Sequence, residues 1–86
     1  MEYRIYAVRD EAVQSFGVPF FVTTEAVALR NFKILCNDPN STVYKSPSDF
    51  ALYCLGSYND EDASFSSILP ALVLRASSCV KEPLNE

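Results

Sequence analysis

The sequence contains no histidine and no tryptophan, and it has only two glycines, Gly17 and Gly56. Without histidine the chain cannot build a Ser-His-Asp triad, a Cys-His nucleophile pair or an imidazole proton shuttle. With two isolated glycines it cannot form a Gly-rich phosphate loop, which argues against a kinase or nucleotidase. No serine lies in a Gly-x-Ser-x-Gly motif. These absences predict that the protein is not an enzyme.

Cysteine is also scarce, and its spacing excludes the usual metal sites. Cys36, Cys54 and Cys79 form no Cys-x-x-Cys pair, whereas a structural zinc site takes four ligands in closely spaced pairs. The acidic stretch Asp60-Glu61-Asp62 lacks the spacing and the central glycine of a calcium loop, so we expect a solvated turn. The sequence therefore predicts neither a metal nor a cofactor. We expect Cys36 and Cys54 to be buried apolar residues in a reducing compartment.

Long hydrophobic runs are missing. The longest, Ile68 to Leu74, is far shorter than the ~20 residues that a membrane-spanning helix needs. Met1 to Arg4 shows no basic region followed by an apolar segment of the kind found in signal peptides. We therefore expect no membrane partner, and we expect the protein to stay in the compartment where it is made.

Length and composition indicate one small globular domain. The chain has 86 residues, of which 49% are hydrophobic and 21% are charged, and folding removes roughly 60–65% of the surface of a chain of this size from water. Seven Lys and Arg against eleven Asp and Glu give a net charge of −4. The basic residues are scattered, which excludes a protein that coats nucleic acid by bulk charge attraction.

Alternation of apolar residues predicts the strands. The predicted extended segments are Glu2–Val8, Phe20–Val22, a short piece at Thr42–Lys45, Phe50–Tyr58 and a hairpin return at Ala63–Ile68. The segment Phe50–Tyr58 is apolar on both faces, which indicates a central strand or one covered by a second subunit. Within it, Gly56 predicts a bulge or a close approach of two backbones.

One main helix is predicted to begin after Thr23-Thr24 and to run from Glu25 to about Asn37. Its apolar stripe, which we expect to pack on the sheet, consists of Ala28, Leu29, Phe32, Leu35 and Cys36. The opposite side carries Val27, Arg30 and Ile34, a candidate partner-facing surface. The alternative is that these aliphatic residues are merely exposed.

These elements predict an α+β fold, a small antiparallel sheet of three to four strands with one main helix packed on one face. We expect a single domain over residues 1–69. Residues 70–86 form a C-terminal segment in which a short helix can start at Pro70, followed by a loose tail over Pro83–Glu86. The uncovered sheet face is too apolar for open water, which predicts a homodimer or a complex with a partner.

Five tyrosines and six phenylalanines are the main positive feature of the composition. Aromatic rings on an exposed sheet stack unpaired bases when a cation lies nearby. The candidate contact residues for nucleic acid or a protein partner are Arg4, Tyr6, Arg30, Lys33 and Tyr53. The alternative is that these rings pack against one another across strands and stabilise the sheet.

An ordered series of short motifs adds a family resemblance. The series comprises Pro19-Phe20-Phe21, Ala28-Leu29-Arg30-Asn31-Phe32, Asn37-Asp38-Pro39-Asn40-Ser41, Pro47-Ser48-Asp49-Phe50, Leu52-Tyr53, Leu55-Gly56 and the acidic turn. It resembles the small nonstructural protein of gokushovirus-type microviruses, which are tailless phages with single-stranded DNA genomes. The resemblance covers Met1 to Ser67. Relatives often have Gly at the end of the acidic turn, where this chain has Ala63, and the segment after Pro70 does not clearly match.

The resemblance implies a nonstructural phage protein, made in the cytoplasm of the infected bacterium and not kept in the virion. It implies an accessory role in replication or packaging of the single-stranded DNA genome, by weak DNA binding or by contacts with replication or capsid proteins. A host-directed regulatory module that docks a bacterial protein is the alternative. Neither hypothesis involves a small-molecule substrate.

Overall fold

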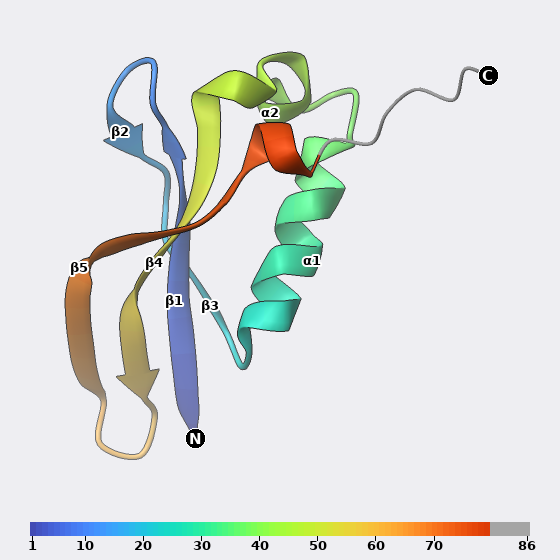
Figure 1. The fold of residues 1–86 in the computed structure, drawn as a ribbon. Coiled ribbons are helices and arrows are strands. Elements are labelled where there is room, and N and C mark those ends of the chain that lie inside the picture. Colours follow the sequence, from blue (N-terminus) through green and yellow to red (C-terminus); the bar gives the residue numbers. More distant parts are fainter. Residues whose placement is uncertain (80–86) are drawn as a thin grey trace.

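The structure is a computed structural model, and it describes residues 1–79 (Figure 1). Its elements are β1 (Glu2–Asp10), β2 (Ser15–Phe16), β3 (Phe20–Val22), α1 (Glu25–Cys36), α2 (Thr42–Lys45), the 3-10 turn η1 (Pro47–Asp49), β4 (Phe50–Asn59), β5 (Ser64–Arg75) and the 3-10 turn η2 (Ala76–Ser78). The α+β class with one main helix is confirmed. The antiparallel sheet is larger than expected, because it has five strands rather than three to four.

Strand β1 is the centre of the sheet. It pairs with β4 on one side, while β2 and β3 share its other side, and β5 pairs with β4 at the far edge. All pairings are antiparallel. Short turns join β1 to β2 and β4 to β5, as in hairpins, whereas β1 and β4 are far apart in the sequence. The predicted strands at Glu2–Val8, Phe20–Val22 and Phe50–Tyr58 are confirmed, and the first and the third extend slightly further.

Capping residues determine where helix α1 begins and ends. The Thr24 hydroxyl accepts a hydrogen bond from the Val27 backbone N–H at 3.4 Å, and Glu25 lies in the positive first turn. Asn37 caps the end, and Pro39 prevents continuation. The predicted helix is therefore confirmed.

The core lies between α1 and one face of β1 and β4. Its largest fully buried side chains are Tyr6, Phe32, Leu52 and Cys36. Ala28 joins them, as the predicted stripe requires, while Leu29 and Leu35 are half-buried at its margins. Figure 1 shows α1 on this side of the sheet, and within residues 1–79 no helix lies over the opposite face.

Two predicted elements are wrong. Thr42–Lys45 is not extended but forms the single turn α2, since the Ser41 hydroxyl accepts a hydrogen bond from the Tyr44 backbone N–H at 3.1 Å and caps it. No α-helix starts at Pro70, because β5 continues through it to Arg75, and only the 3-10 turn η2 follows. Proline is tolerated at this edge, where one side of the strand has no hydrogen-bonded neighbour.

Strand β5 runs through residue 69, the predicted boundary between the domain and the C-terminal segment. The strand crosses this position without interruption, and its second half runs from the sheet edge towards α1 (Figure 1). Val73 and Leu74 of this half pack against the core, and Ala76, the first residue of η2, is part of it. The predicted tail, Pro83–Glu86, lies outside the described residues. In the described part of the chain, no helix has the length and apolar character needed to cross a membrane.

The expected bulge in β4 is confirmed. The pairing between β4 and β5 shifts register between Cys54 and Gly56. Gly56 has a φ of +142°, and a Cβ there would collide with the Ser66 backbone oxygen. Glycine is required here both by the backbone angle and by the close approach of β5.

Candidate interaction surface

Aromatic side chains gather on the sheet face that α1 leaves uncovered. Tyr6 points into the core, so alternation turns Tyr3 and Ile5 to the other face. The strand register then sets Tyr3 beside Tyr58 and Tyr58 beside Phe65, while Phe21 lies opposite Ile5. Tyr3, Phe21, Tyr58 and Phe65, from β1, β3, β4 and β5, form the aromatic patch.

The rings of the aromatic patch are in mutual contact. The ring centroids of Tyr58 and Phe65 are 4.8 Å apart, and those of Tyr58 and Phe21 are 5.7 Å apart at a near-perpendicular angle of 81°. Tyr3 lies 6.4 Å from Tyr58. Phe21 is 46% exposed and Phe65 is 66% exposed. The four rings, with Asp60 and Ala63, line a shallow hollow of about 440 Å³, so the patch offers a preformed apolar surface to a partner.

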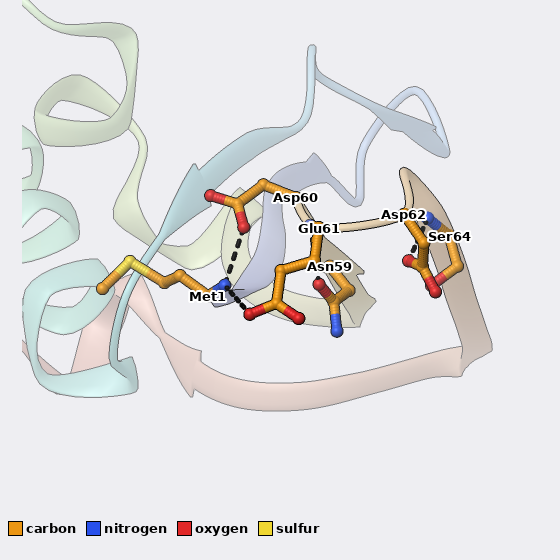
Figure 2. A network of polar contacts seen from close by, with 6 residues as sticks. All are labelled: Met1, Asn59, Asp60, Glu61, Asp62 and Ser64. Carbon is orange, nitrogen blue, oxygen red and sulfur yellow. Dashed lines mark hydrogen bonds and ion pairs between the residues drawn. The ribbon is translucent and has the colours of Figure 1, made fainter.

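The rim of the aromatic patch is acidic. Figure 2 shows the β4–β5 turn, where the Met1 amino group contacts Asp60 at 2.7 Å and Glu61 at 3.5 Å. The hydrogen bond to Asp60 is the main cause that raises the pKa of this amino group. Asp62 accepts a hydrogen bond from the Ser64 backbone N–H at 3.1 Å, and its bonds to Ser64 lower the pKa of Asp62. The expected exposed turn is confirmed, and it places negative charge beside the rings.

A second aromatic pair lies at the other end of the same sheet face. Phe16 and Tyr53 meet edge to face with their ring centroids 5.4 Å apart, and the Arg9 guanidinium lies 5.3 Å from the Phe16 ring. The Tyr53 hydroxyl donates to Glu11 at 2.9 Å, and Glu11 also pairs with Arg9 at 3.2 Å. This network fixes Tyr53, a predicted contact residue, in a half-buried position.

Tyr6 was predicted as a contact residue, and the structure corrects this. Its side chain is fully buried beneath α1. Its hydroxyl accepts a hydrogen bond from Arg4 Nε at 2.9 Å and donates one to Glu25 at 3.0 Å, and burial raises the pKa of Tyr6. Tyr6 therefore cannot stack a base. Arg4 lies on the α1 side of the sheet and Tyr53 on the other, so the two do not share one surface.

The candidate residues on α1 are only partly brought together. Arg30, Lys33 and Ile34 line an open hollow of about 760 Å³ along the outer side of the helix, where Ile34 is 63% exposed. Val27 is half-buried and packs against the core. The proposed partner-facing set therefore reduces to Arg30 and Ile34.

Sequence reasoning did not select the aromatic patch. Alternation within Glu2–Val8 placed Tyr3 on one face with Ile5, but nothing in the sequence says that α1 covers the other face. The hairpin around the acidic turn could have paired Tyr58 with Phe65, because the short turn fixes the register.

The fold and the surface define a small α+β protein with one main helix and an uncovered aromatic sheet face. The family described as Phage ORF5 protein matches residues 3–79, and the chain belongs to this family. The motif resemblance ended at Ser67. The family match extends beyond it and includes the second half of β5 and η2. Neither the curated proteins nor the solved structures contain a significant match.

Proposed function

We propose that this phage accessory protein is not an enzyme and acts in the host bacterial cytoplasm, during replication or packaging of the single-stranded DNA genome. In this proposal it binds no cofactor and works by contacts with replication or capsid proteins. The observation that carries the proposal is the aromatic patch, with Phe65 at 66% exposure. Tyr and Phe are enriched at protein interfaces because their rings bury a large area at little entropic cost.

Charge favours a protein partner over DNA. A base stacked on Tyr58 or Phe65 would bring its phosphates close to Asp60 at the rim of the aromatic patch. Binding of single strands needs cations along the backbone path, whereas the chain carries a net charge of −4. Arg4, one of the predicted cations, lies on the opposite face of the sheet.

A second copy of the chain is the partner that β5 suits best. The strand forms one edge of the sheet, and Ile68, Leu69 and Leu72 are 50%, 89% and 46% exposed. Residues 64–74 carry no charge, while Asp62 precedes them and Arg75 ends the strand. Two antiparallel copies of β5 would place each Arg75 beside the acidic turn of the other copy. The proposed homodimer thus joins uncharged edges flanked by complementary charges.

The substitution Phe65→Ser tests the proposal, with Val18→Ser as the matched control. Both side chains are exposed apolar residues, but Val18, at 88% exposure, lies outside the aromatic patch. We expect Phe65→Ser to reduce capture of the phage replication and capsid proteins about tenfold or more, and Val18→Ser to leave it unchanged. Equal capture by both variants contradicts the proposal. So does tight, salt-dependent binding of a single-stranded oligonucleotide.

The outer side of α1 favours the host-directed alternative. Ile34 projects beside Arg30 in the hollow along the helix, and an exposed aliphatic residue next to a cation suits an acidic groove on a bacterial protein. Ile34→Ser separates the two hypotheses. If capture of a host protein falls with Ile34→Ser and not with Phe65→Ser, α1 rather than the aromatic patch is the docking surface.

A further inference from the structure

Two cysteines that are far apart in the sequence meet at the end of α1. Cys36 is the last residue of the helix and is fully buried, while Cys79 follows η2 and is half-buried. Their Sγ atoms are 2.7 Å apart across 43 residues of sequence. The described segment from Ala76 to Cys79 thus lies directly against the C-terminal end of α1 (Figure 1).

Hydrogen bonds of the Cys79 backbone hold the two sulfurs in this arrangement. The Cys79 N–H donates to the Ala76 carbonyl at 3.0 Å, and the side-chain amide of Asn37 donates to the Cys79 carbonyl at 3.4 Å. Ala76 is fully buried in the core. Since a disulfide bond measures about 2.05 Å, the sulfurs need to approach by only about 0.7 Å.

We propose that Cys36 and Cys79 are an oxidisable pair, which a hydroperoxide converts to an intramolecular disulfide that fastens η2 to α1. This inference does not depend on the proposed function. In a reducing compartment the thiols stay free, and the bond forms when the protein meets the oxidant.

The reaction proceeds in two balanced steps. The Cys79 sulfur, the more exposed of the two, attacks one peroxide oxygen, so that an S–O bond forms, the O–O bond breaks and the leaving oxygen takes up a proton. The Cys36 sulfur then attacks the resulting sulfenic acid. An S–S bond forms, the S–O bond breaks, and the hydroxide leaves as water with the Cys36 proton. One hydroperoxide is reduced and two thiols are oxidised.

The second step should accelerate with pH. Burial, followed by the contact with Cys79, raises the pKa of Cys36 to about 12. The thiolate is the attacking form, so closure quickens as the pH rises towards that value.

The test treats the reduced full chain with stoichiometric hydrogen peroxide and maps its disulfides without reduction. We expect a cross-link between the tryptic peptides Ile34–Lys45 and Ala76–Lys81. We also expect a melting temperature about 10 °C above that of the reduced protein, because the bond closes a long loop. Cys54→Ser is the matched control, because Cys54 is buried in β4 and takes no part in the contact between Cys36 and Cys79, and this variant should form the same cross-link.

Cys79→Ser should show neither the cross-link nor the rise in melting temperature. Because Cys79 is only half-buried, we expect this variant to fold even if Cys36→Ser does not. The proposal is overturned if peroxide leaves Cys79 as an uncrosslinked oxidised thiol. It is equally overturned if the bond joins two molecules or involves Cys54.

Discussion

At Gly56 the backbone of β4 adopts a φ of +142° where it passes the Ser66 carbonyl. We expect Gly56→Ala to destabilise the protein by about 2–4 kcal/mol, because the added methyl group meets rigid backbone at an unfavourable φ. Gly17→Ala is the control, since a Cβ added at this position would meet its nearest atom, the Val8 oxygen, at an ordinary 3.4 Å. Urea unfolding measures both variants. If Gly56→Ala loses no more unfolding free energy than Gly17→Ala, the result would contradict the close approach of β5.

The lowered pKa of Asp62 predicts how the stability of the protein changes in acid. Its side-chain and backbone hydrogen bonds to Ser64 hold the pKa of Asp62 below its ordinary value of 3.8. A lowered pKa in the folded state contributes stability above pH 3.8, and this contribution is lost as the pH falls through the folded pKa. We expect Ser64→Ala to move the pKa of Asp62 back towards 3.8. An NMR titration of the carboxyl carbon, with Ser66→Ala as control, measures the shift, and an unchanged pKa would rule out this role of Ser64.

At the scale of elements, the one-turn helix α2 depends on a single hydroxyl. Ser41 is 9% exposed, its Oγ accepts from the Tyr44 N–H at 3.1 Å, and its O–H donates to the Leu35 carbonyl at 2.9 Å. We expect Ser41→Ala to cost about 1–2 kcal/mol of unfolding free energy. Thr24→Ala should cost only about 0.5 kcal/mol, because the Thr24 cap bond is exposed. Chemical denaturation measures the unfolding free energy of both variants. A loss of unfolding free energy in Ser41→Ala that is equal to or smaller than that in Thr24→Ala would contradict the prediction.

Local chemistry made some elements predictable and left others ambiguous. Helix α1 follows from Thr24, Glu25 and Asn37, whose side chains act on neighbouring backbone. Pro70 is ambiguous locally, since it suits both a first helical turn and an edge strand. Pairing with β4 decides in favour of the strand, and that contact is long-range.

The same distinction explains the candidate contact residues. The alternation in β1 shows that Tyr6 and Tyr3 point to opposite faces, but the sequence does not say which face receives α1. The helix covers Tyr6, and Tyr3 joins the aromatic patch. The choice of Tyr6 thus failed because tertiary packing, rather than strand propensity, determines which ring is exposed.

At the scale of the whole molecule, the proposed dimer depends on the charges at the two ends of β5. Arg75 is exposed and has no ion-pair partner within the part of the chain that the structure describes. We expect Arg75→Glu to raise the dimer dissociation constant by about tenfold, because two symmetric attractions become repulsions. Arg30→Glu, the same charge change on the outer side of α1, is the control. Sedimentation velocity measures both variants, and equal weakening would exclude β5 pairing.

The position of β1 between two sets of strands has a consequence for how the protein opens. Its amide protons face β4 on one side and β2 or β3 on the other, whereas β5 bonds to the sheet along one side only. Deuterium should therefore enter β5 before β1, since edge segments detach at a lower free energy than the centre. The strand proposed for self-association would then also leave the sheet before its central strand.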